Sequence, residues 1–296
     1  MSIRVEVVVV AYGAPDLLDA CLGALGGGFD VVVVVDNSSD ADVHRVVEAH
    51  GADYVDPGRN LGFAAGVNLG IRRLSRPLGD VLLLNPDATV TPDAVARLSS
   101  RLRSDPWLAC VAPAQVDPQD GTTARVGWPF PTPAGAWLEA LGGGGLRRHV
   151  DFLIGSVLLI RSEALADVGP FDEEFFLYAE EIDWQRRART RGWRVALCPD
   201  VTATHVGAGT GGDSEEREVH FHASHERYVR KHFGAAGWGV YRAALVLGSG
   251  ARALVLPADR RRRAAFRFRL YRSGPMRVES RSGAPPLRGQ DASGGT

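Results

Sequence analysis

Short apolar runs and helix-spaced apolar positions alternate along the first ninety residues of the chain. Val5 to Val10, broken only by Glu6, and Val31 to Val35 are runs of valine, and Val81 to Leu84 is a third apolar run. Unbroken runs of this length, bounded by turn residues, are typical of strands buried on both faces. A segment with leucines at helical spacing lies between the first two runs. We therefore predict a β-α-β-α-β order with a parallel sheet and right-handed crossovers.

The same pattern continues less regularly in the second half of the chain. Gly155 interrupts one predicted strand there, which indicates a bulge or a close approach of another group. The further elements that we predict are strands at 108–112, 152–160, 193–197 and 201–204, and helices at 92–103, from about 180 to 191, and 215–233.

Polar side chains follow two of the predicted buried strands directly. Asp36 comes after the second run, and Asn85, Pro86 and Asp87 come after the third. In an open α/β sheet, ligands bind at the carboxyl ends of the strands. Oxygen-bearing side chains at that edge suit a divalent cation that also holds a phosphate. The alternative for Asp36 and Asp87 is helix capping, because aspartate is a good cap.

A glycine-rich stretch between these strands reads as a turn that opens a helix. It contains Asn60, Gly62, Gly66 and Asn68. A helix amino terminus near the sheet edge is a natural place for a phosphate. Gly66 and Asn68 are poor helix formers, and this local inconsistency indicates a site rather than a scaffold.

An acidic cluster, Glu180, Glu181 and Asp183, lies among aromatic residues at the start of a predicted helix. Acids at that position suit the helix dipole, and Asp183 and Arg187 are spaced to pair. The simple alternative is therefore a solvated, salt-bridged helix start. The flanking aromatics favour a partly desolvated setting, in which the pKa of a carboxylate rises toward values useful for a general base.

Composition excludes few classes of function. The chain has 296 residues and a net charge of −1, which favours no particular partner. Its three distant cysteines match no metal spacing and no disulfide framework, so we expect a reducing cytoplasm. No signal peptide is visible, and no apolar run approaches the about 20 residues that a membrane span needs.

The composition changes from Arg242 onward, where arginines alternate with apolar and aromatic residues. We divide the chain into a domain at 1–233, a basic and apolar helical appendage at 234–272, and a disordered tail at 273–296. The appendage fits the surface of an anionic membrane, so we expect a peripheral contact at the inner face of the plasma membrane. Nucleic-acid binding and an ordinary solvated helix are the alternatives, and we expect no nucleic acid.

With Asp36, the Asn60 to Asn68 stretch and Asn85-Pro86-Asp87 in this order, the chain resembles family 2 glycosyltransferases of the GT-A fold over roughly residues 3 to 233. It is most similar to the rhamnosyltransferase-like branch. The resemblance implies a Rossmann-like mixed sheet flanked by helices. It further implies that Asp36 binds the nucleobase, that Asp87 holds Mg²⁺ or Mn²⁺ on the donor diphosphate, and that His205 is a second metal ligand.

In the same family, the second acid of an acidic motif at the place of Glu180 to Asp183 is the catalytic base. That position is Glu181 here, where the family more commonly has aspartate, so Glu180 and Asp183 stay candidates. We place Tyr12, Asn60, Gly62, Asn68 and Asn85 on the donor side of the site.

The expected activity is inverting transfer of a rhamnose-like sugar from a dTDP- or UDP-sugar to a glycan or polyprenyl-linked acceptor in cell-surface polysaccharide synthesis. Transfer of galactofuranose or N-acetylglucosamine is an alternative, as is a non-catalytic nucleotide-sugar binding module. A nucleotidyltransferase is disfavoured, because residues 12–15 do not form a glycine-rich triphosphate loop.

Overall fold

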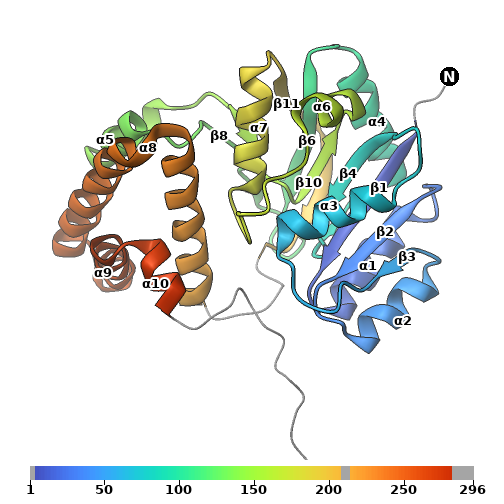
Figure 1. Ribbon diagram of the computed structural model, residues 1–296, viewed down its shortest axis with the longest axis horizontal. Coiled ribbons are helices and arrows are strands. Elements are labelled where there is room, and N and C mark those ends of the chain that lie inside the picture. The colour runs from blue at the N-terminus through green and yellow to red at the C-terminus, as the bar shows by residue number, and fades with distance from the viewer. Residues whose placement is uncertain (1–3, 208–213, 282–296) are drawn as a thin grey trace, which may run out of the picture.

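The computed structural model describes residues 4–207 and 214–281, without the side chains of residues 214 and 259. Two parts lie side by side in Figure 1: a sheet flanked by helices, here called the sheet domain, and a group of helices, here called the helical lobe.

The sheet of this domain is mixed. In its amino-terminal half, β1 pairs in parallel with β2 and β4, and β2 pairs in parallel with β3, as predicted. Beyond β4 the order changes, because β10 lies antiparallel between β4 and β6. The strands in spatial order are β3 (Asp53–Val55), β2 (Val32–Asp36), β1 (Val5–Ala11), β4 (Asp80–Leu84), β10 (Val157–Ile160), β6 (Leu108–Val116), β11 (Arg194–His205) and β5 (Ala88–Thr89).

Helices cover both faces of the sheet. Val7 and Val9 of β1 pack with α1, α2 and α4 on one face, and Val8 and Val10 pack with α3, α6 and α7 on the other. Alternate residues of a strand point to opposite faces, so two buried faces require an unbroken apolar run. The helices are α1 (Pro15–Leu25), α2 (Ala41–Ala49), α3 (Phe63–Arg73), α4 (Pro92–Arg103), α6 (Ser162–Val168) and α7 (Glu180–Thr190).

The segment between β6 and β10 first returns along β6, where β7 pairs antiparallel with it, and then reaches the helical lobe. Its elements are β7 (Thr123–Ala124), β8 (Gly127–Trp128), α5 (Pro133–Ala140), the 3₁₀ helix η1 (Gly143–Leu146) and β9 (Phe152–Leu153). β8 and β9 form a separate two-stranded pair.

The helical lobe consists of α5, η1, α8 (Ser214–Val255), α9 (Ala258–Ser273) and α10 (Pro275–Arg281). Its aromatic core includes Tyr228, Trp238 and Tyr271, and Ile182 of α7 joins that core from the sheet domain. The helical nature of residues 234–255 and 258–272 agrees with the predicted appendage. The predicted boundary after residue 233 falls inside α8, where Gly234 has a non-helical φ of 69°.

The prediction of a disordered tail from residue 273 is wrong for residues 275–281, which form α10. Glu279 of this helix is buried and binds His220 and Arg227 of α8. An acid that meets two basic partners gives a short segment enough contacts to order it, which composition did not reveal. Residues 282–296 of the predicted tail lie outside the described residues.

Candidate functional site

A cavity of about 1230 Å³ lies at the carboxyl edge of the sheet, with α8 and α9 on its other side. Its position matches the ligand edge expected for an open α/β sheet. Six residues predicted for the site line it: Tyr12, Asn60, Gly62, Asn85, Asp87 and His205.

Asp87 and His205 lie together on the wall of the cavity. The ring nitrogen Nε2 of His205 is 3.3 Å from Oδ1 of Asp87. Their positions follow from the antiparallel pairing of β5 with the end of β11, in which His205 faces Ala88. Within residues 4–207 and 214–281, no group of three or more histidine, cysteine, aspartate or glutamate side chains is arranged around a metal position. A carboxylate and an imidazole would leave most positions around a divalent ion to phosphate oxygens and water, which suits Mg²⁺ or Mn²⁺.

Asn85 is held at the end of β4 by its backbone. Its amide N–H donates to the carbonyl of Ser156 at 2.8 Å, and its carbonyl accepts from Ala88 at 3.1 Å. The tight turn through Pro86 ends the strand and returns the chain to the sheet at β5. This turn places Asn85, Pro86 and Asp87 on one stretch of the cavity wall.

Asp36 is not among the residues that line the cavity, and its contact with the nucleobase stays a prediction. It is fully buried, and its two oxygens accept from Ser38 N at 2.9 Å, Asp40 N at 2.9 Å and the Tyr54 hydroxyl at 2.9 Å, and also from the Ser38 hydroxyl. Burial and this bond raise the pKa of Tyr54. With its acceptor positions in use, Asp36 shapes the turn after β2.

The next residue, Asn37, lines the cavity instead, and sequence reasoning missed it. Its side chain donates to the carbonyl of Gly62 at 3.0 Å and accepts from Leu61 N at 3.3 Å. These bonds join the turn after β2 to the start of α3. The signal was present in the sequence, because Asn37 directly follows Asp36 at the strand end.

Asn60 and Gly62 form the turn that opens α3. Asn60 accepts a hydrogen bond from Gly62 N at 2.9 Å, and Gly62 has a φ of 81°, a conformation that favours glycine. A Cβ atom at residue 62 would clash with the carbonyl oxygen of Phe176. That oxygen accepts a hydrogen bond from Phe63 N at 2.7 Å. Only glycine therefore allows the segment before α7 to approach α3 this closely.

Asn68, predicted to lie on the donor side of the site, is not among the residues that line the cavity. Its side chain is buried, donates to the carbonyl of Phe171 at 2.8 Å and to Glu173 at 2.9 Å, and accepts from Phe171 N at 3.0 Å. These bonds point it at the segment between α6 and α7 and away from the cavity. Gly66 likewise serves packing, because a Cβ atom there would meet Val10.

Glu180 and Glu181 begin α7 after two residues in the left-handed region, Tyr178 (φ 69°) and Ala179 (φ 67°). Non-glycine residues in this conformation are strained, and such strain clusters at functional sites. Tyr178 lines the cavity, whereas neither glutamate is among its lining residues. A Cβ atom at Gly155 would be 3.7 Å from Glu181 and 3.8 Å from Phe63, a cavity-lining residue.

The two glutamates differ in exposure and ionisation. Glu180 is buried, and burial together with the neighbouring Glu181 charge raises its pKa well above the ordinary value. Glu181 is partly exposed, and burial of its carboxyl group raises the pKa to about 7. One oxygen of each is buried without a hydrogen-bond partner within the part of the chain that the structure describes. Glu181 is thus the acid whose pKa suits a general base near neutral pH.

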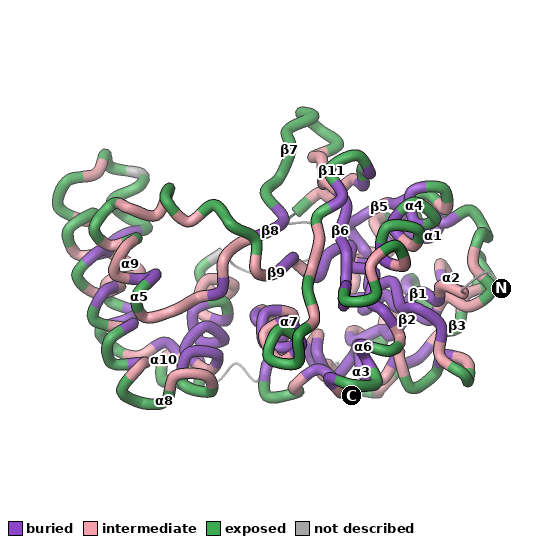
Figure 2. Tube along the Cα trace, turned by 90° about the horizontal axis from the view of Figure 1, so that it is seen from above, coloured by how far each residue is buried: buried purple, intermediate pink, exposed green. Residues whose placement is uncertain are grey.

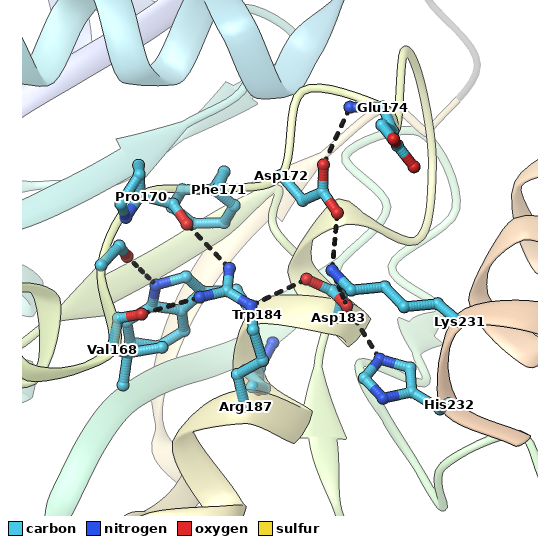
Figure 3. Close-up of polar contacts among 12 residues, drawn as sticks. Val168, Pro170, Phe171, Asp172, Glu174, Asp183, Trp184, Arg187, Lys231 and His232 are labelled. Atoms are coloured by element: carbon cyan, nitrogen blue, oxygen red, sulfur yellow. Dashed lines mark hydrogen bonds and ion pairs between the residues drawn. The ribbon is translucent and has the colours of Figure 1, made fainter.

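Asp183 is fully committed to a network with α8, shown in Figure 3. It accepts from Arg187 at 2.9 Å, Lys231 at 2.8 Å and His232 at 2.8 Å. Burial alone would raise the pKa of Asp183, but the hydrogen bonds from His232, Lys231 and Arg187 outweigh burial and lower it to about 2. The predicted pairing with Arg187 is confirmed. Asp183 is a structural anchor of α7 and an unsuitable base.

The opposite wall of the cavity is basic, which sequence reasoning did not connect with the site. Arg217 of α8 and Arg262, Arg263, Arg267 and Arg269 of α9 line it. Arg263 and Arg267 bind Glu218 of α8. These arginines are more than 120 residues after Asp87, and only the folding of α9 beside α8 brings them to the cavity.

The chain is similar to known families and proteins along most of its length. A family model described as glycosyltransferase-like family 2 matches residues 4–233. The low-salt glycan biosynthesis hexosyltransferase Agl10 of Haloferax volcanii is 28% identical over 215 residues, which are 68% of this chain and 66% of that protein. The chain thus spans just under two thirds of the length of this relative.

A second relative and two solved structures extend the comparison. The N-acetylglucosaminyl-diphospho-decaprenol L-rhamnosyltransferase of Mycobacterium tuberculosis is 28% identical over 256 residues, 76% of this chain and 83% of that protein. A mannosyltransferase from Pyrobaculum calidifontis, in complex with GDP-Man and Mn²⁺, superposes with a TM-score of 0.57 at 18% identity. This match covers 94% of this chain and 85% of that protein. Glucosyl-3-phosphoglycerate synthase from M. tuberculosis, in complex with Mn²⁺ and UDP, superposes with a TM-score of 0.56 at 17% identity. This match covers 77% of this chain and 80% of that protein. The fold is thus the GT-A-like fold of nucleotide-sugar transferases.

Proposed function

The chain belongs to glycosyltransferase-like family 2, and we propose that it transfers a sugar from a nucleotide-diphospho-sugar to an acceptor hydroxyl, with a divalent metal and inversion at the anomeric carbon. The observation that carries this proposal is the placement of Asp87 and His205, 3.3 Å apart, on the wall of a cavity at the carboxyl edge of the sheet.

Asp87 and His205 would hold the metal, Mg²⁺ or Mn²⁺, on the donor diphosphate. When bound, the metal supplies positive charge that stabilises the departing diphosphate. The solved structures of similar fold contain Mn²⁺ with UDP or GDP-Man, which supports this assignment. Asn85 lies beside Asp87 on the same wall and is suited to orient the diphosphate.

The nucleoside end of the donor fits the part of the cavity between β1 and the start of α3. Tyr12, Asn37 and Asn60 line that part, and Asp36 holds the turn that carries Asn37. A pyrimidine base offers an N–H donor and carbonyl acceptors to such side chains. Uracil and thymine present the same hydrogen-bonding edge, so dTDP- and UDP-sugars are both included.

Glu181 is the proposed general base. Its carboxylate takes the proton of the acceptor hydroxyl while the acceptor oxygen bonds to the anomeric carbon. The bond from that carbon to the diphosphate oxygen breaks on the opposite face, and the nucleoside diphosphate leaves. A single displacement of this kind inverts the anomeric centre. Beside it, burial and the neighbouring Glu181 charge raise the pKa of Glu180 well above its ordinary value.

The proposed donor sugar is rhamnose-like, and the proposed acceptor is a glycan or a polyprenyl-linked sugar of a cell-surface polysaccharide. The name of the M. tuberculosis relative, a rhamnosyltransferase with a diphospho-decaprenol acceptor, supports both choices. Galactofuranose and N-acetylglucosamine are the alternative donor sugars.

The test is donor turnover across dTDP-rhamnose, UDP-galactofuranose and UDP-N-acetylglucosamine, with Mn²⁺, with Mg²⁺ and with EDTA. We expect one donor to be hydrolysed in a metal-dependent reaction, and the Glu181→Gln variant to lose it. Nuclear magnetic resonance of a transferred sugar then reads the anomeric configuration. Donor binding by calorimetry without turnover of any donor would instead identify a nucleotide-sugar binding module.

A further inference from the structure

An apolar stripe lies on the exposed side of α8. Val240, Ala243, Leu247, Ala251 and Leu254 are all exposed. They are three, four, four and three residues apart, the spacing that places residues on one face of a helix. The exposed fraction rises along the stripe from 49% at Val240 to 59% at Leu247 and 85% at Leu254.

The stripe runs between the two helices that cover the other sides of α8. Gly248 packs against Ala140 at the end of α5, and Gly250 packs against Phe268 of α9. Within residues 4–207 and 214–281, no element covers the face between these contacts, which extends over about four turns. Large apolar side chains rarely gather on an uncovered surface without a binding role.

Two further leucines extend the apolar surface from α5 and η1. Leu141 and Leu146 are each 80% exposed. Leu141 directly follows Ala140, which meets Gly248, and Arg252 of α8 donates to the carbonyl of Glu139. The end of α5 therefore lies beside the far end of the α8 stripe.

Arginines are concentrated in the same part of the chain. Residues 240–272 contain nine arginines and one acidic residue, although the whole chain has a net charge of −1. Arg260 to Arg263 are exposed directly after the turn between α8 and α9, where Val255 is 78% exposed. Figure 2 shows exposed residues along the outer part of this lobe, away from the sheet domain.

We infer that this surface, the α8 stripe with Leu141, Leu146 and the arginines that follow it, docks on an anionic lipid bilayer. An apolar helix face flanked by arginine is the composition of an element that lies in a membrane interface. Anionic headgroups complement the segregated positive charge, which a second copy of the same basic surface would not. Among the residues that the structure describes, none of the helices has the length and apolarity that a membrane crossing requires.

Docking would hold the mouth of the cavity at the membrane. Arg262 and Arg263, seven and eight residues after Val255, line the cavity. A lipid-linked acceptor would then reach the cavity without leaving the bilayer. This consequence rests on the proposed function, whereas the docking itself does not.

The experiment is co-sedimentation of the full chain with sucrose-loaded vesicles of phosphatidylcholine, alone or with about 30% phosphatidylglycerol. We expect binding only to the anionic vesicles, with strong weakening in high salt. Leu247→Ser with Leu254→Ser should lower the partition coefficient about tenfold or more. Arg260→Gln with Arg261→Gln should lower it by about tenfold.

Matched controls lie on the sheet domain. Trp107→Ser with Leu197→Ser removes two exposed apolar side chains there, and Arg72→Gln with Arg73→Gln removes two exposed arginines at the end of α3. Both pairs should bind vesicles as the unchanged chain does. Circular dichroism and urea unfolding check that every variant folds.

Several results would overturn the inference. These are no binding of the unchanged chain, equal binding to neutral vesicles, or stripe variants that bind as before. A dimer by light scattering that the leucine variant converts to a monomer, without vesicle binding, would assign the stripe to a second copy. Tighter binding to an oligonucleotide that survives the leucine substitutions would assign the arginines to nucleic acid. Donor hydrolysis needs no membrane, so its loss or retention tests the proposed function separately.

Discussion

Replacing Glu181 by glutamine tests the proposed chemistry most directly. The substitution keeps the size of the side chain and removes its ability to take a proton. General-base catalysis contributes roughly 10²- to 10⁴-fold, so kcat should fall by about that factor. KM for the donor should change little, because neither glutamate lines the cavity near Asp87 and His205.

The pKa of Glu181 sets the expected pH dependence. Burial raises it from an ordinary 4.5 to about 7, and the base must be deprotonated to act. In the unchanged enzyme, kcat/KM should therefore rise with pH to an inflection near 7 and level off above it. The residual activity of Glu181→Gln should lack this inflection.

The same shift predicts an effect on stability. Between pH 4.5 and 7 the folded state holds a proton at Glu181 that the unfolded state has lost, so the free energy of unfolding falls as the pH rises through this range. The full loss is roughly 3 kcal/mol. Glutamine does not ionise, so the variant should be more stable than the parent at pH 8.5 and similar at pH 4.

Initial-rate kinetics from pH 5.5 to 9 and urea unfolding at three pH values measure these effects. Glu180→Gln is the matched control: it removes the neighbouring carboxyl, which is not the proposed base, and its replacement should cost less than about tenfold in kcat. A Glu181→Gln enzyme that keeps more than a tenth of kcat, or a parent profile without an inflection near 7, would refute the assignment of the base.

Four further predictions concern the metal, the turns and the anchor of α7. Asp87→Asn should raise the Mn²⁺ concentration for half-maximal activity at least about tenfold, and an unchanged metal titration would count against the metal site. Asp36→Asn should lower the free energy of unfolding, measured in urea, by about 2 kcal/mol, because one buried hydrogen-bond acceptor becomes an N–H group that faces other N–H groups. Loss of nucleotide-sugar binding without loss of stability would instead support direct contact between Asp36 and the nucleobase. Asp183→Asn should cost roughly 3 kcal/mol in urea unfolding. Its folded pKa near 2 lies below its ordinary value of 3.8, so this stability is present above pH 3.8 and lost as pH falls through 2. A cost at pH 2 that equals the cost at pH 8 contradicts the network. Gly62→Ala should destabilise by about 1–3 kcal/mol through the clash with Phe176, and unchanged melting would show that the backbone there adapts.

The amino-terminal half of the fold was predictable because its strands are buried on both faces. That burial demands the valine runs at β1 and β2, and the parallel pairing of these strands follows from the helices between them. The antiparallel insertion of β10 between β4 and β6 was not predictable. An apolar run identifies a strand but carries no information about which neighbour it pairs with.

The site was predictable in part for the same reason. Asn85 and Asp87 follow a buried strand, and the sheet brings such positions to one edge. Asp36, by contrast, is the last residue of its strand: it still pairs with β1, opposite Ala11, and its carboxylate closes the turn. The next residue, Asn37, therefore lines the cavity in its place. A shift of one residue decides which side chain faces the cavity, and hydrophobic patterning does not locate the end of a strand to within one residue.

The order of residues alone was enough to specify the classes of element, the edge of the sheet that carries the candidate site and the residue types gathered there, because buried strands and their turns have local signatures. What depends on partners far along the chain was set by the folded arrangement. Lys231 and His232, 48 and 49 residues later in the chain, bind Asp183 and make it an unsuitable base. The arginines of α9 face the cavity only because α9 folds back along α8. Ionisation and exposure are set by these neighbours, and a linear sequence does not state which neighbours will meet.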